Sequence, residues 1–208
     1  MWLPVLLILV IGYLLGNLNG AVCISRLVAH EDVRQQGSGN AGLTNFIRVY
    51  GATKALSVIL IDGGKAVAAC LMGGLLLSPY GMQMEGMAIG GTAVLLGHVF
   101  PVLLGFKGGK GILSGFFVAI TVDWRIAVLI LAVFAVAYLS TQYVSLGSVL
   151  ASITFGVGFV IFHHDNWIVM LCGVLMAVLA TFMHRENIVR LLKKQERKTN
   201  LFGKGSKQ

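Results

Sequence analysis

Long apolar runs dominate this sequence and restrict it to folds that a lipid bilayer can hold. Hydrocarbon side chains fill stretches at roughly 3–22, 52–77, 83–105, 111–122, 125–140, 144–162 and 166–183. A helix needs about 20 mostly apolar residues to cross the hydrocarbon core, and its backbone polar groups must be satisfied internally. We therefore predict an all-α polytopic integral membrane protein with about seven transmembrane helices, the 111–122 and 125–140 pieces being short, tilted or partly re-entrant.

The composition agrees with a membrane protein of one domain. Of 208 residues, 57% are hydrophobic and only 12% are charged, and the mean hydropathy is +0.85, outside the range of ordinary soluble domains. We expect a single domain over residues 1–208 with a short basic tail at about 184–208. The first run lacks a charged leader and a small-residue cleavage site, so we expect a membrane helix rather than a signal peptide. The scattered cysteines predict neither disulfides nor a zinc site.

The basic residues predict the orientation of the chain. With the N-terminus outside, all but Arg125 of the 16 Lys and Arg residues fall on or near the inner side. Cytoplasmic loops carry such an excess. The C-terminus is then cytoplasmic, and the segment 23–51, the loop 106–110, the turn near Gln142 and the tail share one face. We expect their polar groups to form one site.

The first polar motif, residues 37–48, reads GSGNAGLTNFIR. Its glycines allow successive N–H groups to turn toward one anion, and Arg48 supplies a planar fork suited to phosphate. Side-chain donors come from Ser38, Asn40, Thr44 and Asn45. Two alternatives stay open: the cluster is a plain turn, and Thr44 only caps the next helix.

The second motif, residues 97–111, reads GHVFPVLLGFKGGKG. It is not a Walker A loop, because Lys110 is followed by glycine rather than Ser or Thr. Backbone donors at Gly108, Gly109 and Gly111, with the ammonium groups of Lys107 and Lys110, predict a cradle for a phosphate or an acyl phosphate. In the second apolar run, 52–77, Asp62 and Lys65 are expected to pair with each other, because lone charges in membranes are costly.

The third motif, residues 184–192, reads HRENIVRLL. Helical spacing places His184 and Asn187 on one face, with Arg190 further round; a basic amphipathic helix at the lipid headgroups is the alternative. Ser145 belongs to a weaker patch, since helical serines often bond their own backbone. Paired carboxylates, protease motifs and metal-ligand spacings are missing. The motifs contain many hydrogen-bond donors for anions and few side chains that could act as a base. This combination suits a substrate that already carries a good leaving group.

In this order, the three motifs resemble the bacterial acyl-phosphate:glycerol-3-phosphate acyltransferase family (PlsY), and the likeness extends to DVRQ, DGGK and YVSLGS. The resemblance implies transfer of a fatty acyl group from acyl phosphate to the 1-hydroxyl of glycerol 3-phosphate, giving lysophosphatidic acid and phosphate. It implies the catalytic residues Ser38, Lys107, His184 and Asn187. It implies the substrate-binding residues Asn40, Thr44, Asn45, Arg48, His98, Gly108, Gly109, Lys110, Gly111, Ser145 and Arg190.

The resemblance further implies no coenzyme A, no metal and no other cofactor, and a bacterial inner membrane location with the active site on the cytoplasmic face. The expected partners are the two substrates, the lipid bilayer and other phospholipid-synthesis enzymes, but no nucleic acid. The chain departs from the family pattern at Gly16-Asn17-Leu18-Asn19, where Gly-Ser-Ile-Pro is usual, and at Lys194-Gln195-Glu196, where Gly-x-Glu is usual. The alternatives are an anion transporter and an impaired paralogue that acts as a membrane partner of lipid enzymes.

Overall fold

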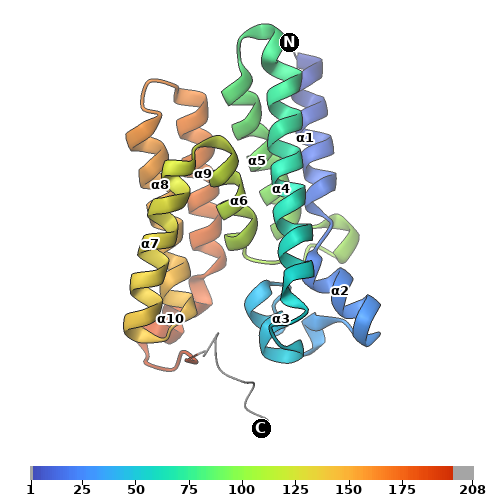
Figure 1. Cartoon of the computed structure of the whole chain (residues 1–208), viewed down its shortest axis with the longest axis vertical. Helices are drawn as coiled ribbons and strands as arrows, with labels where there is room; N and C mark the ends of the chain where they lie inside the picture. The colour runs from blue at the N-terminus through green and yellow to red at the C-terminus, as the bar shows by residue number, and fades with distance from the viewer. Residues whose placement is uncertain (1, 199–208) are drawn as a thin grey trace.

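A computed structural model of the chain describes residues 2–198, and helices account for its regular structure in that range (Figure 1). The α-helices are α1 (Trp2–Gly16), α2 (Gly20–Ala29), α3 (Leu43–Tyr50), α4 (Ala55–Leu77), α5 (Gln83–Val99), α6 (Ile112–Val122), α7 (Trp124–Thr141), α8 (Val144–Phe162), α9 (Trp167–Met183) and α10 (Arg185–Leu192). Three short 3-10 helices are η1 (Val33–Gln35), η2 (Ser78–Tyr80) and η3 (Val102–Leu104). The end of the predicted basic tail lies outside the described residues.

Helix length supports a multi-pass membrane protein. Within residues 2–198, five helical stretches are long and apolar enough to cross a bilayer, and α9 with α10 makes a sixth if this pair, bent by 54°, is one span. The α6 helix is apolar but has only 11 residues, as the sequence predicted, whereas α7 reaches 18 residues and is not short. The prediction of about seven spans stays a prediction.

The helices form two groups that α6 joins. In Figure 1, α1, α4 and α5 stand side by side, α7, α8 and α9 form the other group, and α6 lies between them. Glycines let helices of the first group approach closely: a Cβ on Gly16 would overlap the backbone of α5 at Gly97. The shared core contains Cys70, Leu95, Val118 and Phe159, from α4, α5, α6 and α8.

The polar segments gather at one end of this bundle, which we call the basic end. It comprises residues 17–54, 100–111, 141–143 and 184–198 (Figure 1). The turns that carry Asp123 and Asp165 lie at the opposite end. The three sequence motifs therefore lie at the same end of the fold, as their expected sidedness requires.

The first apolar run is not one continuous helix. The sequence predicted a span over 3–22, but α1 ends at Gly16 and α2 begins at Gly20. Asparagine side chains hold the break: Oδ1 of Asn17 accepts from the N–H of Leu103 at 3.0 Å, and Oδ1 of Asn19 caps α2 by accepting from the N–H of Val22 at 3.0 Å. Short polar side chains compete with the helical backbone for its own hydrogen bonds, which explains the break.

Candidate functional site

Asn45 organises the first motif from inside. Its side-chain Nδ2 lies 3.1 Å from the carbonyls of Val33, Gln36 and Asn40, and its Oδ1 accepts from the N–H of Ser38 at 2.8 Å. The residue is 2% exposed. These contacts use both ends of the amide, so Asn45 shapes the loop. Its expected role in substrate binding stays a prediction.

The other members of this motif surround that buried amide. Ser38 is exposed on the turn between η1 and α3, while Thr44 is half-buried. The N-cap of α3 is Gly42, with no side-chain cap bond, so the alternative that Thr44 caps this helix is wrong. Arg48 lies in the last turn of α3; partial burial and the nearby Arg197 lower its pKa.

The loop at residues 106–111, which we call the glycine loop, is bonded through its backbone to the end of α5. The N–H of Gly108 donates to the carbonyl of Val99, and that of Gly109 to the carbonyl of His98, both at 3.2 Å. These are two of the three amides expected to hold an anion, and both donate to the protein itself in this structure. Gly111 has φ +83° and is the N-cap of α6. The first N–H groups of a helix lack helical partners and favour anions.

Arg34 joins the first motif to the glycine loop. Its NH1 donates to the carbonyls of Leu104 at 2.8 Å and Lys107 at 3.1 Å. Its Nε and NH2 donate to the two carboxylate oxygens of Asp32 at 3.0 and 2.8 Å. Hydrogen bonds from Arg34 hold the pKa of the Asp32 carboxyl well below its usual range. The bidentate pair thus fixes where the Lys107 backbone lies.

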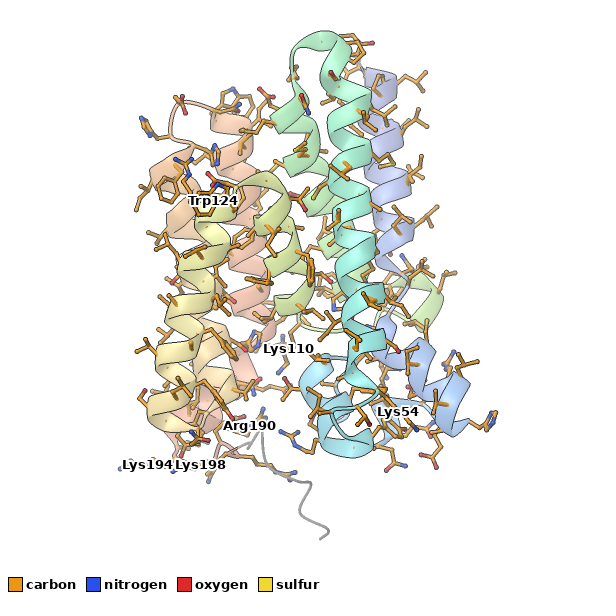
Figure 2. All side chains as sticks on the ribbon, viewed as in Figure 1. Lys54, Lys110, Trp124, Arg190, Lys194 and Lys198 are labelled. Atoms are coloured by element: carbon orange, nitrogen blue, oxygen red, sulfur yellow. The ribbon has the colours of Figure 1, made fainter. Side chains whose placement is uncertain are left out.

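A chain of polar contacts joins the glycine loop to the third motif. Nζ of Lys110 donates to Oδ1 of Asn187. Nδ2 of Asn187 then donates to Oε1 of Glu196 at 3.0 Å, and Nε of Arg190 donates to Oε2 at 2.9 Å. Figure 2 shows Lys110 and Arg190 at the same end of the bundle. Burial and the nearby Arg190 lower the pKa of Lys110.

His184 lies between α9 and α10 and presents one nitrogen as an acceptor. Its Nδ1 is 2.8 Å from the carbonyl of Ala180. A carbonyl oxygen only accepts, so Nδ1 carries the proton and Nε2 holds the lone pair. Burial lowers the pKa of His184 to about 4, so its ring is neutral at pH 7.

Three other expected residues differ in exposure. Lys107 is exposed beside the loop. Ser145, at the start of α8, is buried, and its Oγ has no hydrogen-bond partner among the described residues. His98 is 4% exposed and lies behind the loop. Nδ1 of His98 is 2.9 Å from Nζ of Lys65, which also pairs with Asp62 at 2.8 Å. The expected Asp62–Lys65 interaction is therefore confirmed.

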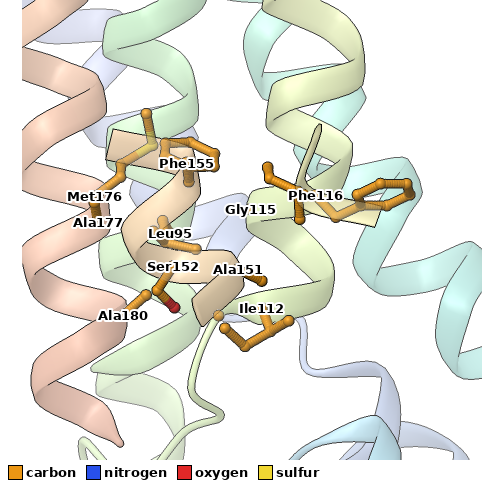
Figure 3. A pocket seen from close by; sticks show the side chains of 12 residues that line it. Leu95, Ile112, Gly115, Phe116, Ala151, Ser152, Phe155, Met176, Ala177 and Ala180 are labelled. Carbon is orange, nitrogen blue, oxygen red and sulfur yellow. The ribbon is translucent and has the colours of Figure 1, made fainter. Parts of the chain in front are cut away.

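A small apolar pocket begins directly above the glycine loop. Its free volume is about 20 Å³, about enough for one water molecule. Figure 3 shows Ile112 and Gly115 of α6 facing Ala151 and Phe155 of α8 across it, with residues of α5 and α9 beside them. A larger apolar groove of about 620 Å³ runs between α8 and α9 and ends near Phe182.

Sequence reasoning missed several residues that build this site. Arg34 and Asp32 were noted only within the DVRQ likeness, and Glu196 only within a departure from the family pattern. Arg34 acts on Leu104 and Lys107, which are 70 or more residues further along the chain. Glu196 reaches the site because the tail after α10 folds back to Asn187. The charge of Arg34 beside a glycine-rich loop was the available signal.

The chain is similar to known proteins over most of its length. Residues 6–194 match the family model for glycerol-3-phosphate acyltransferase. The chain is 36% identical to the glycerol-3-phosphate acyltransferase of Finegoldia magna over 95% of this chain and 97% of that protein. It is 40% identical to the Thermoanaerobacter sp. (strain X514) enzyme of the same name, over 91% and 92% of the two chains.

Solved structures give the same result. The crystal structure of PlsY (YgiH), an integral membrane glycerol 3-phosphate acyltransferase, in its glycerol 3-phosphate form superposes with a TM-score of 0.83 at 31% identity, covering 96% of this chain and 99% of that chain. The form described as containing lysophosphatidic acid gives a TM-score of 0.81 at 30% identity. This chain therefore belongs to the glycerol-3-phosphate acyltransferase family.

Proposed function

We propose that this protein transfers a fatty acyl group from acyl phosphate to the 1-hydroxyl of glycerol 3-phosphate, at the cytoplasmic face of a bacterial inner membrane. The observation that carries the proposal is the contact between Lys110 and Asn187, which brings the glycine loop and the third motif together. Two anionic substrates need cations and amide donors, and this contact places one ammonium beside one side-chain amide. Relatives named glycerol-3-phosphate acyltransferase support the acceptor substrate.

The acyl phosphate would lie at the start of α6. Its phosphate would meet the N-terminal N–H groups of α6 and the ammonium of Lys107 or Lys110. Its acyl chain would enter from the bilayer, with the carbon next to the carbonyl at the small pocket above Gly111. The glycerol 3-phosphate would be held by Arg48, Arg190 and the second N–H of the Asn187 amide, since the first donates to Glu196. The side chain of Ser38, exposed on the first loop, would donate to the developing oxyanion.

Acyl transfer needs one proton to leave the attacking hydroxyl. The oxygen at C1 forms a bond to the acyl carbon, the bond from that carbon to the phosphate oxygen breaks, and phosphate leaves with the electron pair. A phosphate oxygen has a pKa of about 6, whereas the pKa of His184 is about 4. The phosphate is the stronger base, so we propose that it takes the proton and that Nε2 of His184 orients the hydroxyl.

A single assay tests the reaction. Purified protein in detergent is incubated with palmitoyl phosphate and glycerol 3-phosphate, and lysophosphatidic acid and free phosphate are measured. Equal amounts of both products support the proposal. Phosphate transport into proteoliposomes without either product would favour the anion transporter, and neither activity would favour the impaired paralogue. The transporter is disfavoured because the charges of Asp62 and Lys65 pair with each other rather than line a path.

A further inference from the structure

Three titratable side chains meet behind the glycine loop, and the proposed mechanism uses none of them. Asp62 and Lys65 lie one turn apart on α4, with Oδ1 and Nζ 2.8 Å apart and side chains 2% exposed. His98, on α5, is 2.9 Å from Nζ through its Nδ1. Charged groups inside a membrane domain are costly and normally have a role. We therefore expect this cluster to contribute to the function of the protein.

Lys65 closes the break between α1 and α2. Its Nζ donates to the carbonyl of Leu18 and, at 3.2 Å, to the carbonyl of Gly16. These carbonyls lack helical partners because α1 ends there. Across the break, Oδ1 of Asp62 accepts from the N–H of Gly20 at 3.0 Å. The charged pair of α4 thus binds both sides of the break.

The same ammonium fixes the tautomer of His98. An ammonium group only donates hydrogen bonds, so Nδ1 of His98 accepts and the neutral ring carries its proton on Nε2. A protonated ring would direct an N–H group at the ammonium. Among the described residues Nε2 makes no hydrogen bond, and it faces the glycine loop: a Cβ on Gly109 would overlap it.

Gly109 is the point where the first and second motifs meet. A Cβ there would also lie 3.0 Å from the carbonyl oxygen of Ala41 in the first motif. That oxygen accepts from Nδ2 of Asn19 at 2.9 Å, and Asn19 belongs to the break that Lys65 closes. One ammonium therefore supports Gly109 from two directions, through His98 and through the α1–α2 break with Ala41.

We propose that Lys65 is a positioning residue that holds the first motif and the glycine loop in register. It acts through His98 and the α1–α2 break, without touching substrate. The three N–H groups of its ammonium serve four acceptors, so no neutral side chain of similar length replaces it. The inference rests on the proposed acyl transfer, and it assigns His98 to support of the loop rather than to substrate binding.

Two variants separate positioning from stability. Lys65→Met leaves the Asp62 carboxylate buried and unpaired, which lowers thermal stability. Asp62→Asn/Lys65→Met removes both charges and is expected to recover most of that loss. We expect both variants to lose about 100-fold in kcat, because small misplacements of reacting groups cost about that much. Activity that returns together with stability in the double variant would overturn the proposal.

A destabilised variant away from the cluster serves as the control for the loss of kcat. Phe159 is fully buried in the core toward the opposite end, far along α8 from the basic end. Phe159→Leu is expected to lower the melting temperature while kcat per folded protein stays at the wild-type value. An equal loss of kcat in this control would attribute the Lys65 effect to general loosening of the bundle, against the proposal.

His98 supplies a variant that keeps the fold and a readout without turnover. His98→Phe keeps a ring beneath Gly109 and leaves Lys65 three acceptors; we expect it to fold, with kcat about 10-fold lower because the loop loses its link to Lys65.

In protein labelled with ¹⁵N-histidine, His98 should show the Nε2–H tautomer, assigned with His98→Gln. An Nδ1–H or doubly protonated ring would overturn the proposal. The spectrum tests the contact between His98 and Lys65 without any turnover. A wild-type protein that makes no lysophosphatidic acid would refute the proposed function but not this contact.

Discussion

Lys110 donates a hydrogen bond from Nζ to Oδ1 of Asn187, and the other side of the same amide, Nδ2, donates to Glu196. A cation on one side and an anion on the other leave the amide one orientation, because an ammonium only donates and a carboxylate only accepts. The loop before α6 and the helix α10 are therefore held together through one side chain. The tail after α10 contributes to the site through Glu196.

Replacement of Glu196 tests that contribution. Glu196→Ala removes the acceptor of both Asn187 and Arg190, so we expect acyl transfer to fall about 10-fold as α10 loses its orientation. Initial rates of phosphate release measure the effect. The matched control is Glu186→Ala, since Glu186 is 75% exposed in its side chain and lies 3.8 Å from Arg190. Equal losses in the two variants would argue against a specific role for Glu196.

Lys107 is expected to be essential for turnover. Lys107→Ala removes an exposed cation beside the loop, so the repulsion between the two anionic substrates is no longer neutralised. We expect phosphate release to fall about 100- to 1,000-fold, as for loss of a key electrostatic contact, while the circular dichroism spectrum stays unchanged. Lys54→Ala, at the same end (Figure 2), should retain full activity. Retained activity in Lys107→Ala would remove this lysine from the site.

Arg34 and Arg26 form a matched pair around one carboxylate. Both donate to Oδ2 of Asp32 at 2.8 Å, but only Arg34 also reaches the carbonyls of the glycine loop. Arg34→Met should lower kcat about 10-fold by releasing the Lys107 backbone. Arg26→Ala should leave it unchanged, because Arg26 is exposed and, in the described part of the chain, its bond goes to Asp32. Steady-state kinetics on both variants decide whether the link to the loop matters.

Burial of neutral His184 predicts a pH dependence of stability. Its folded pKa is about 4, below the value of about 6.5 expected when unfolded. The unfolded state therefore binds the proton first as pH falls, and stability present above pH 6.5 is lost progressively down to pH 4. The loss is about 3 kcal/mol. Melting curves of wild type and His184→Asn between pH 7 and pH 4.5 should show a smaller decrease in the variant.

The kinetic behaviour of the same residue tests the proton path. If phosphate takes the proton, His184→Asn lowers kcat only a few-fold, because the hydroxyl loses orientation but keeps its base. A loss of several orders of magnitude would identify His184 as the base instead. Equal pH profiles of melting in wild type and variant would show that this histidine is not held neutral by burial.

Gly115 tests where the acyl chain lies. A Cβ there would meet only Phe155, at 4.0 Å, so the pocket above the loop has room at this point. Gly115→Leu should fill the pocket and lower kcat/KM about 10-fold for palmitoyl phosphate and octanoyl phosphate alike, because both chains carry the same carbons next to the carbonyl. Gly64→Leu, at a glycine with no atom within 4 Å of an added Cβ, is the control. An unchanged kcat/KM for both substrates in Gly115→Leu would place the acyl chain elsewhere.

The sequence predicted the fold class and the gathering of motifs because both depend on features that repeat or accumulate. Apolar runs of span length give helices, and the bias of Lys and Arg assigns loops to one side. Asp62 and Lys65 were predicted to pair because lone charges within an apolar run are costly, and the pair is present. The break at residues 17–19 was missed, since apolar neighbours on both sides conceal two asparagines that bond outside their own helix.

The details of the site depended on contacts that cannot be predicted from the sequence. The glycines predicted free amides at Gly108 and Gly109, but the loop turns back on the end of α5, where two carbonyls accept from both amides. Asn45 carried the right chemistry for a substrate ligand, but its surroundings saturate it. In both cases a polar group was correctly singled out, and its partner turned out to be the protein.

All three motifs lie at one end of the bundle, and the turns that carry Asp123 and Asp165 lie at the opposite end. If the proposed reaction occurs there, the fatty donor and the lipid product use the same leaflet, and no phosphate group has to cross the bilayer. The enzyme then needs no alternating access and no ion gradient. The outward-facing hydrocarbon side chains of its helices can be exchanged to suit membranes of different composition without any change in the chemistry.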